Sequence, residues 1–322
     1  MRGIKVSGVG KAVPKKSLTN NELCQMVDSS DDWITSRTGI KKRHIAEEET
    51  MTQLAIDAAK EALDESGLDK DKIDLVIVAT VSPDYTMPST ACEVARNLDI
   101  KKAICFDITA ACSGFIYGTQ LAYSMIQTQV VQNALVIGAE TLSKALNYND
   151  RTTCVLFGDG AGAVVYEGTD QNDLLAISIG SKPEGSHMIT LPTIAFDHTF
   201  SKKEEKDAYI HMQGKEVYCF ATTKVPESIQ EVVAKAKVAL EDVDWFVLHQ
   251  ANSRIIDSVA KRLHIEGGKF FKNLPDYGNT SAASIPMALY DLKPQLKQGN
   301  QIILSGFGAG LTWGTMLLRW SK

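Results

Sequence analysis

The first part of the chain carries apolar residues at the spacing of a helix and then in a nearly unbroken run. Thr50 and Gln53 fit a capping box at a helix start, and Gly67 fits its end. Residues 74–80 are almost all apolar, which is typical of a strand covered on both faces. This passage predicts a helix followed by a buried strand. The apolar stripe of the helix is Leu54, Ala55, Ala58, Ala59, Ala62 and Leu63.

The same order of elements returns in the second half of the chain. Pro226 is expected to open a helix, because proline suits the first helical turn, and the strand 244–249 follows it. The apolar stripe of this helix is Ile229, Val232, Val233, Ala236 and Leu240. Both copies continue with a short strand, at 134–138 or 301–305, and then a glycine-containing apolar strand, at 155–166 or 312–320.

A repeat of this length is too long for a solenoid and indicates a duplicated α/β domain. We expect the two halves at 1–172 and 173–322. Strands that alternate with helices predict mixed, mostly parallel sheets that are covered by helices on both faces. Residues 183–207 interrupt the second copy with glycine, histidine and a cluster of charges, and we expect a surface excursion there.

Cys112 stands where a strand should end and a helix begin. Residues 103–108 form a short apolar run, and after the cysteine Phe115, Ile116, Leu121, Ala122, Met125 and Ile126 recur at helical spacing. A thiol on the first turn of a helix faces unpaired N–H groups and the positive end of the helix dipole. The sequence therefore predicts a cysteine whose reactive thiolate form is favoured.

Two further polar residues fall at strand ends, where ligands gather in α/β folds. His249 ends an apolar strand and precedes the polar run 250–254, and Asn279 lies in a segment rich in small polar residues. Each of the three has an ordinary structural explanation. Cys112 would be a core cysteine, His249 a buried hydrogen-bonding group, and Asn279 a turn residue or helix N-cap. Together they form a candidate catalytic constellation.

Composition limits the classes of function. The 322 residues are 44% hydrophobic, and a net charge of −5 without long basic runs argues against nucleic-acid binding. No apolar stretch approaches the ~20 residues that span a bilayer, and no signal-peptide core is seen, so we expect a cytoplasmic protein without membrane contact. The six cysteines form no CxxC pair, which argues against a disulfide framework and a metal site.

The glycines of residues 158–162 invite a nucleotide-loop interpretation. The surrounding sequence lacks the strand-then-helix order and the downstream acidic residue that such a loop requires. We expect these glycines to allow close packing of a strand instead.

Six segments of the chain together resemble one family, the β-ketoacyl-[acyl-carrier-protein] synthase III enzymes of the thiolase superfamily. They are residues 32–40, 109–115, 157–163, 249–252, 278–284 and 306–314. The resemblance runs nearly from end to end. It implies a duplicated thiolase-like α-β-α-β-α sandwich. It also implies an acyltransferase that initiates fatty-acid synthesis from an acyl-CoA starter and malonyl-acyl carrier protein, with no cofactor.

The resemblance assigns a role to each residue of the constellation. Cys112 would attack the thioester of the acyl-CoA and carry the acyl group. His249 and Asn279 would donate hydrogen bonds to the malonyl thioester oxygen and stabilise the enolate that forms as carbon dioxide leaves. The backbone N–H groups of Cys112 and Ala309 would hold the oxyanion at the acyl-cysteine. The family commonly has glycine at the position of Ala309.

The same resemblance implies two sets of binding residues. Trp33 and Arg151 would enclose the adenine of CoA, Arg37 and Thr38 would meet its phosphates, and Asn252 and Gly214 would contact its pantetheine arm. The acidic carrier protein would meet Gln250, Ala251, Asn252 and Ser253, together with a basic patch of Arg254, Lys261 and Arg262. The spacing of those three cations places them on one face of a helix. A solvated helix face is the ordinary alternative.

Met87 stands where family members often have a phenylalanine that reaches across a dimer to close the acyl pocket. The resemblance therefore implies a homodimer. A flexible methionine at this position predicts that branched four- or five-carbon acyl-CoA starters are accepted.

Other members of the superfamily are alternatives. Thiolases and elongating synthases use a second cysteine or a second histidine where this chain has Asn279. Chalcone-synthase-like enzymes share the cysteine, histidine and asparagine, but they are usually longer and take CoA-bound extenders. A polyketide-type ketosynthase or acyltransferase of secondary metabolism stays open, and so does a non-catalytic protein that binds acyl-CoA or a carrier protein.

Overall fold

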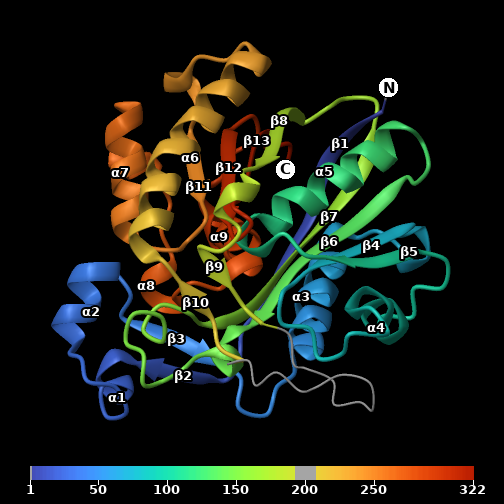
Figure 1. Cartoon of the computed structure of the whole chain (residues 1–322). Coiled ribbons are helices and arrows are strands. Elements are labelled where there is room, and N and C mark those ends of the chain that lie inside the picture. The colour runs from blue at the N-terminus through green and yellow to red at the C-terminus, as the bar shows by residue number, and fades with distance from the viewer. Residues whose placement is uncertain (1, 193–207) are drawn as a thin grey trace.

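Two sheets alternate with layers of helices in this chain. The structure, a computed structural model, describes residues 2–192 and 208–322. Helices α5 (Gly114–Gln127) and α9 (Ser284–Leu292) contact strands of both sheets and form the middle layer. Figure 1 shows α3 and α4 beside one sheet and α6 and α7 beside the other. The predicted α-β-α-β-α sandwich is therefore confirmed.

The first sheet has the strand order β1-β7-β6-β4-β5. Antiparallel ladders join β1 to β7 and β7 to β6, whereas β4 runs parallel to both β6 and β5. Its strands are β1 (Gly3–Ala12), β4 (Leu75–Ala79), β5 (Ile104–Ile108), β6 (Asn133–Thr141) and β7 (Asp159–Thr169).

The second sheet repeats this arrangement in the order β8-β13-β12-β11. The first two ladders are again antiparallel and the third is parallel, and a parallel bridge from Phe246 to Phe270 stands in the place of β5. The strands are β8 (Leu174–Ser181), β11 (Trp245–Leu248), β12 (Gln301–Gly308) and β13 (Thr312–Arg319). The predicted duplication is confirmed, and so are the mixed, mostly parallel sheets, since β7 in the first sheet and β13 in the second are the strands that run opposite to the other strands named here. The boundary at residue 172 stays a prediction.

The outer helices are α3 (Met51–Ser66), α4 (Thr90–Asn97), α6 (Gly214–Ala236) and α7 (Ser253–Leu263). Helix α3 starts and ends as predicted, because the hydroxyl of Thr50 accepts from Gln53 N at 3.0 Å and Gly67 has a left-handed φ of 64°. The Gln53 side chain donates to Asp57 instead of closing the capping box. No helix within residues 2–192 or 208–322 is long and apolar enough to cross a membrane.

Shorter elements cover the lower part of the molecule in Figure 1. They are α1 (Asn20–Leu23), α2 (Asp31–Thr38), α8 (Leu274–Tyr277), and the strand pairs β2 (Lys16–Thr19) with β3 (Lys42–Ile45) and β9 (Ile189–Thr190) with β10 (His211–Met212). The predicted surface excursion at 183–207 falls largely on residues 193–207, which lie outside the described residues.

The prediction that Pro226 opens a helix is wrong. Pro226 lies inside α6, which begins at Gly214. A proline in a helix interior removes one backbone hydrogen bond, so it usually marks a helix start. Here Val225, Pro226 and Ile229 are buried on the face of α6 that packs against β13. Tertiary packing therefore outweighs the local signal.

The glycines of residues 158–162 serve packing, as expected. A Cβ atom on Gly162 would lie 2.7 Å from the backbone nitrogen of Met287, and one on Gly160 would lie 2.8 Å from the Met287 sulfur. Strand β7 consequently lies directly against α9, the helix that corresponds to α5 in the second half.

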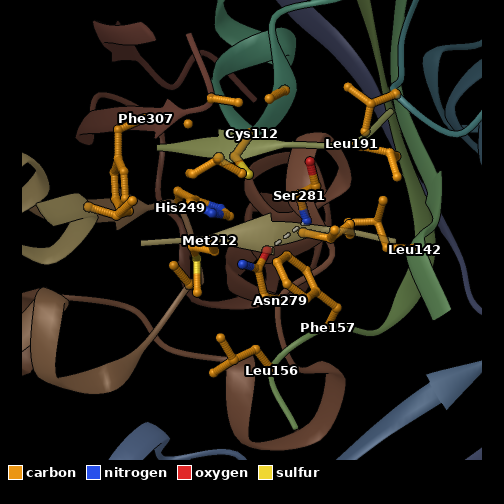
Figure 2. A pocket seen from close by; sticks show the side chains of 18 of the residues that line it. Cys112, Leu142, Leu156, Phe157, Leu191, Met212, His249, Asn279, Ser281 and Phe307 are labelled. Atoms are coloured by element: carbon orange, nitrogen blue, oxygen red, sulfur yellow. Dashed lines mark hydrogen bonds between the residues drawn. The ribbon is translucent and has the colours of Figure 1, made fainter. Parts of the chain in front are cut away.

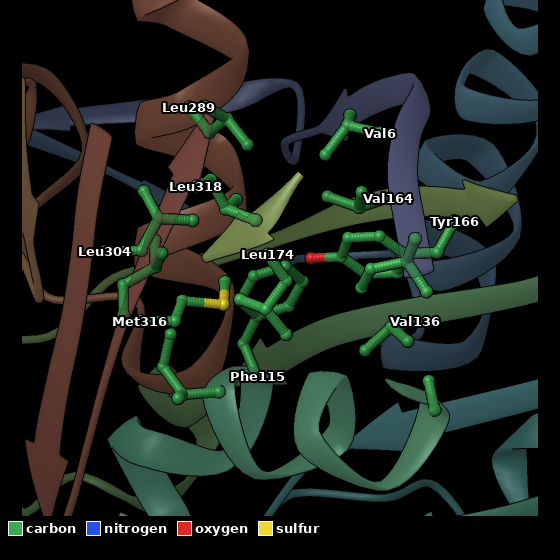
Figure 3. Close-up of a cluster of buried hydrophobic side chains, with 14 of the residues drawn as sticks. Val6, Phe115, Val136, Val164, Tyr166, Leu174, Leu289, Leu304, Met316 and Leu318 are labelled. Carbon is green, nitrogen blue, oxygen red and sulfur yellow. The ribbon is translucent and has the colours of Figure 1, made fainter. Parts of the chain in front are cut away.

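The largest apolar cluster lies between the two sheets and takes side chains from both halves. Figure 3 shows Phe115 on α5 and Leu289 on α9 between side chains of the strands. The other labelled members are Val6, Val136, Val164, Tyr166, Leu174, Leu304, Met316 and Leu318, all buried. This shared core holds the two halves in one arrangement and fixes the start of α5, next to Cys112.

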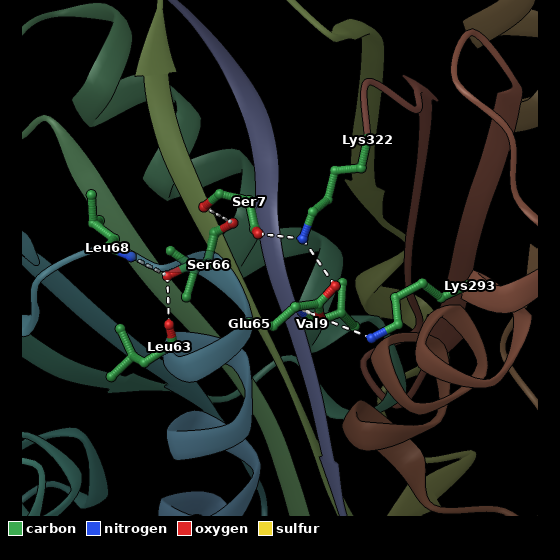
Figure 4. A network of polar contacts seen from close by, with 9 residues as sticks. Ser7, Val9, Leu63, Glu65, Ser66, Leu68, Lys293 and Lys322 are labelled. Carbon is green, nitrogen blue, oxygen red and sulfur yellow. Dashed lines mark hydrogen bonds and ion pairs between the residues drawn. The ribbon is translucent and has the colours of Figure 1, made fainter.

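A polar network also joins the halves. Glu65 on α3 accepts from Val9 N at 2.8 Å and from the ammonium groups of Lys293 and Lys322 at 2.9 Å (Figure 4). Burial alone would raise the pKa of Glu65, but the bonds from Lys322, Lys293 and Val9 outweigh it and hold the pKa below its usual range. A carboxyl group whose pKa is lowered by folding stabilises the protein above its unfolded pKa.

We expect Glu65→Gln to lower the free energy of unfolding by about 1 kcal/mol at pH 7, since it removes a charge from two ion pairs. The difference from the wild type should shrink as the pH falls through the lowered pKa of Glu65, because the carboxylate is then protonated. Urea unfolding at several pH values measures this. Glu93→Gln is the control, because its carboxylate pairs with Arg96 within α4. A cost that is unchanged down to pH 3 would contradict the expectation.

Candidate active site

One cavity of about 880 Å³ brings together the three residues of the predicted constellation. Cys112, His249 and Asn279 all line it, and Figure 2 shows their side chains around one space. Cys112 follows β5, and His249 follows β11 directly. The cavity thus lies beyond the carboxyl ends of parallel strands, as expected for an α/β fold.

Cys112 lies in a short 3-10 turn, η2 (Ala111–Ser113), immediately before α5. Strand β12 lies close to this turn, since a Cβ atom on Gly308 would be 2.7 Å from Cys112 N. The side chain is partly accessible from the cavity. Burial is nevertheless the main influence and raises the pKa of the thiol to about 12, although a hydrogen bond with Ser281 opposes it. The prediction of a favoured thiolate is therefore wrong for the resting protein.

His249 is held by residues of β12 and α9. Its backbone nitrogen donates to Ser305 O at 2.7 Å, its Nδ1 lies 2.7 Å from Ser284 Oγ, and its ring meets the Phe307 ring edge-on at 5.2 Å. Burial lowers the pKa of His249 to about 3. The ring is therefore neutral near pH 7, and when the Ser284 hydroxyl donates to Nδ1, the ring proton lies on Nε2 and is available to the cavity.

Asn279 is fixed through both its backbone and its side chain. Its N–H donates to Leu156 O at 2.9 Å, and its carbonyl accepts from Gly158 N at 3.0 Å. The side-chain Oδ1 accepts from Ser281 N at 2.9 Å, drawn as the dashed line in Figure 2. Because Oδ1 is engaged there, the amide Nδ2 is turned toward the cavity as a donor (Figure 2).

Ala309 directly follows β12, whose last residue, Gly308, lies against Cys112. It lines the cavity together with Gly308 and Gly310. Of these three, only Gly310 has a positive φ, so the alanine occupies a backbone position that an L-residue adopts without strain. The alanine in place of the family's usual glycine therefore leaves the backbone free for the role suggested for it.

The six residues expected to bind CoA all line the cavity: Trp33, Arg37, Thr38, Arg151, Gly214 and Asn252. The guanidinium groups of Arg37 and Arg151 lie 5.7 and 5.5 Å from the centre of the Trp33 ring. Asn252 donates from Nδ2 to the carbonyl of Arg37 at 3.1 Å. An aromatic ring with two cations is a suitable place for a base and its phosphates.

The role expected for Thr38, a contact with the phosphates of CoA, needs a correction. It is 3% exposed, and its hydroxyl donates to Ile34 O at 2.7 Å and accepts from Ile40 N at 3.0 Å. Both bonds terminate α2, so the hydroxyl is not offered to a phosphate.

The residues expected to meet a carrier protein separate into two groups. Arg254, Lys261 and Arg262 are exposed on α7, and Ala251, Asn252 and Ser253 are partly exposed before and at its start. Gln250 was also expected to contact the carrier protein, and that expectation is wrong. Gln250 is 1% exposed, its amide donates to Leu248 O and Phe271 O, and its Oε1 accepts from Asn273 N and Leu274 N. It supports the loop instead.

Met87 projects away from the chain's own cavity. It is 85% exposed and does not line the cavity, whereas its neighbours Tyr85 and Thr86 do. Within one chain it therefore closes no acyl pocket.

Two residues near the thiol were missed by the sequence reasoning as functional groups. Ser281 lines the cavity in the turn η7 (Ser281–Ala283), and Glu140 is completely buried at the end of β6. An acidic residue in an otherwise apolar strand was a usable signal for Glu140. Nothing in the local pattern distinguishes Ser281 from an ordinary turn serine.

Comparisons with known proteins agree with this geometry. The 3-oxoacyl-[acyl-carrier-protein] synthase III family matches residues 106–183, and the C-terminal part of that family matches residues 233–320. The chain is 44% identical to the β-ketoacyl-[acyl-carrier-protein] synthase III of Clostridium acetobutylicum, over the full length of both proteins. It is 47% identical to that of Desulfitobacterium hafniense, over 100% of this chain and 99% of the relative.

Solved structures give the same result. The synthase III of Aquifex aeolicus superposes with a TM-score of 0.93 at 45% identity, over 99% of this chain and 100% of that one. A priming β-ketosynthase of the R1128 polyketide pathway reaches a TM-score of 0.94 at 32% identity, over 100% of this chain and 97% of the other. The chain belongs to the 3-oxoacyl-[acyl-carrier-protein] synthase III family.

Proposed function

We propose that this protein is a β-ketoacyl-[acyl-carrier-protein] synthase III, an acyltransferase that starts fatty-acid synthesis. It joins an acyl-CoA starter to malonyl-acyl carrier protein and yields β-ketoacyl-carrier protein, CoA and CO2. The observation that carries the proposal is the meeting of Cys112, His249 and Asn279 in one cavity whose mouth holds Trp33, Arg37 and Arg151. The reaction requires no cofactor besides its substrates, and we place it in the cytoplasm.

In the first stage the thiol of Cys112 attacks the acyl-CoA thioester and releases CoA. The tetrahedral intermediate carries an oxyanion, which needs donors fixed beforehand. The backbone N–H groups of Cys112 and Ala309 are the proposed donors, since both residues line the cavity and Gly308, which precedes Ala309, lies against Cys112 N.

In the second stage the malonyl group loses CO2 and its carbanion attacks the acyl-cysteine. His249 and Asn279 donate hydrogen bonds to the malonyl thioester oxygen, where negative charge develops. Burial keeps His249 neutral by lowering its pKa to about 3, so the ring acts as a hydrogen-bond donor that does not readily give up a proton. A neutral donor stabilises the enolate without protonating the carbanion.

The entrance suits CoA. We propose that Trp33 and Arg151 enclose the adenine, that Arg37 meets the phosphates, and that Gly214 and Asn252 contact the pantetheine arm. The Arg151 guanidinium lies 5.5 Å from the centre of the Trp33 ring, and each of these planar groups can stack on an adenine that separates them.

The exposed cations of α7 are the proposed contact for the acidic carrier protein. We expect Lys261→Glu to raise the KM for malonyl-carrier protein about tenfold and to leave acylation by acyl-CoA unchanged, since charges across an interface mainly steer association. The effect should weaken at high salt. Lys261 is the best choice because Arg254 also donates to Ser36 O and Arg262 to Thr223 Oγ1.

Steady-state kinetics with carrier protein, at low and high salt, measure this prediction. Lys60→Glu is the control, since Lys60 is exposed on α3 on the other outer layer. Equal effects of the two substitutions would indicate that net charge, and not the α7 surface, is responsible.

A homodimer is also proposed. β5 is an edge strand, and Ile104 on it, Leu121 on α5 and Met87 before α4 are 44, 41 and 85% exposed. Large apolar side chains gathered at a free sheet edge are typical of an interface. Met87 would then close the acyl pocket of the partner subunit and, being flexible, admit branched starters.

The decisive experiment is intact mass spectrometry after incubation with acyl-CoA. The wild type should gain one acyl mass that survives denaturation, Cys112→Ser should gain none, and malonyl-carrier protein should remove the acyl group. A non-catalytic binding protein would release its ligand on denaturation. Acetyl-, isobutyryl- and isovaleryl-CoA should all load Cys112, and loading by acetyl-CoA alone would overturn the role given to Met87.

A further inference from the structure

His249 can stabilise the enolate in only one of the two forms of its neutral ring. A neutral histidine carries one ring proton, so one nitrogen donates and the other accepts. The proposed role requires the proton on Nε2, because a bare Nε2 would turn a lone pair toward the enolate oxygen. Nδ1 of His249 lies 2.7 Å from Ser284 Oγ, whereas no hydrogen bond among the described residues engages Nε2. The group that fixes the ring proton therefore acts through Nδ1.

The hydroxyl group of Ser284 is closed off from solvent and has two partners. Ser284 is the first residue of α9 and is 1% exposed. Its Oγ lies 2.7 Å from Nδ1 of His249 and 3.4 Å from the backbone nitrogen of Gln250. No other hydrogen bond of this hydroxyl is found within residues 2–192 and 208–322. One N–H group and one ring nitrogen thus have to satisfy it.

The backbone nitrogen of Gln250 decides the direction of one of these bonds. A backbone N–H can only donate, so the Ser284 oxygen is the acceptor at this contact. Gln250 is 1% exposed, and in the described part of the chain the Ser284 oxygen is the one acceptor found for its N–H. A buried N–H without an acceptor is costly. The hydroxyl proton of Ser284 is then left to Nδ1 of His249.

The opposite form of the ring leaves a buried proton without a partner. If Nδ1 carried the ring proton, the Ser284 oxygen would accept from both of its neighbours, and the hydroxyl proton would have no acceptor. A serine in a helix can instead donate to a carbonyl three or four residues earlier. Among the described contacts the Ser284 hydroxyl makes no such bond. An unpaired buried donor costs more than a typical hydrogen bond contributes, so this form is disfavoured.

The other enolate donor is oriented from the same segment, residues 281–284. The N–H of Ser281 donates to Oδ1 of Asn279 at 2.9 Å, which turns the amide nitrogen toward the cavity (Figure 2). A Cβ atom on Gly138 of β6 would lie 2.1 Å from Ala282 O, so the segment is packed directly against β6. A closely packed backbone is a rigid base for both orienting hydrogen bonds.

We propose that Ser284 is a positioning residue for condensation, whose hydroxyl donates to Nδ1 of His249 and so keeps the ring proton on Nε2, facing the malonyl thioester oxygen. This inference rests on the proposed function and deepens it. A donor that is fixed beforehand needs no reorganisation when charge develops. Ser284 does not line the cavity, so it acts on the reaction through the His249 ring.

A purely structural role for Ser284 would be to satisfy the N–H of Gln250. The two roles use different parts of one hydroxyl group, because the oxygen accepts from Gln250 and the proton goes to His249. Loss of the first contact disturbs the loop after β11, whereas loss of the second changes the position of the ring proton. The position of the ring proton therefore separates the two roles.

The direct test locates the ring proton of His249 by NMR. Long-range proton–nitrogen correlations, on protein labelled at the histidine nitrogens, distinguish a protonated ring nitrogen from a bare one. The signals that disappear in His249→Ala belong to this ring. The wild type should show a protonated Nε2 and a bare Nδ1, and Ser284→Ala should show both forms, because neither then has a partner at Nδ1. A protonated Nδ1 in the wild type, or an unchanged ring in Ser284→Ala, would overturn the inference.

A kinetic test separates the two stages of the reaction. Ser284→Ala should slow condensation by pre-acylated protein about tenfold, as expected for one lost hydrogen bond, and leave acylation of Cys112 within about twofold. Ser284→Thr keeps the hydroxyl and should restore most of the condensation rate. Ser228→Ala is the control and should change neither rate. Ser228 is a 0% exposed serine of α6 that bonds to Val225 O and Thr315 Oγ1 and does not line the cavity.

An equal loss in both stages would assign Ser284 a purely structural role and overturn the inference, and so would full condensation activity in Ser284→Ala. Should Ser284→Ala fail to fold, Ser284→Cys takes its place, since a thiol is only a weak donor, and a smaller loss confined to condensation is expected. If no acyl-CoA loads the wild type, the proposed function fails, and the NMR measurement still decides the position of the ring proton.

Discussion

Asn279→Asp and His249→Ala are expected to leave acylation of Cys112 within a few-fold of the wild type and to slow condensation by about 100- to 1,000-fold. Each substitution removes one donor to the enolate oxygen, and each donor of this kind contributes that much to a rate. Asn279→Asp is the sharper change. It keeps the oxygen that accepts from Ser281 N, so the turn η7 stays in place, while the Nδ2 donor is lost.

The two stages are measured separately. Intact mass after rapid mixing with acyl-CoA gives the acylation rate, and release of CO2 from malonyl-carrier protein by pre-acylated protein gives the condensation rate. His187→Ala is the control for loss of a histidine, since His187 is exposed outside the cavity. If either variant at the site failed in acylation as strongly as in condensation, the division of labour between Cys112 and the other two residues would be wrong.

The protonation state of His249 leads to a prediction for the pH dependence of condensation. His249 has its pKa lowered to about 3, so its neutral form persists throughout the range from pH 5 to 9. Condensation by the pre-acylated protein should therefore show no inflection from His249 in that range.

The duplication explains why one cavity holds groups from both halves. The turns η2 and η7 occupy corresponding places before α5 and α9, and each begins with a left-handed residue, Ala111 or Ser281. The first turn supplies the thiol and the second the hydroxyl and, just before it, the amide of Asn279. Since the two turns pack against each other, residues far apart in sequence meet at one point.

Much of this arrangement could be predicted from the sequence because the signals are repeated. The helix predicted before 74–80 and the helix predicted before 244–249 form a repeated pattern, so each supports the interpretation of the other. The ends of predicted strands indicated that Cys112 and His249 lie at the site. The sequence did not indicate which strands run antiparallel, because β7 and β13 are as apolar as the parallel strands beside them. Apolar runs report burial on both faces and do not report orientation.

Other errors came from properties that only the packed structure determines. Gln250 was grouped with the exposed start of α7, yet its amide satisfies four backbone groups inside the loop. The thiolate expected of Cys112 followed from the helix end alone, whereas burial in the cavity dominates its pKa. Both cases show that a local sequence pattern gives the position of a polar group but not its desolvation.

Phe115→Ala is expected to lower the free energy of unfolding by about 3–5 kcal/mol. Phe115 is 0% exposed, and in Figure 3 it lies near Met316 and Leu174 of the second half. The substitution leaves a cavity between the sheets that backbone atoms of two layers cannot easily fill. Urea unfolding measures the loss, with Met26→Ala as the control, because Met26 is 58% exposed and should cost less than about 0.5 kcal/mol.

The same variant tests whether the two halves fold as one unit. Because the cluster around Phe115 contains side chains of both sheets, the variant should unfold in a single transition at a lower urea concentration. Two transitions, with only one shifted, would show that each half keeps a core of its own. A cost below about 1 kcal/mol would mean that the layers close over the cavity. In that case the start of α5, and the Cys112 turn before it, would be held chiefly by the glycine contacts of β12 and not by the shared core.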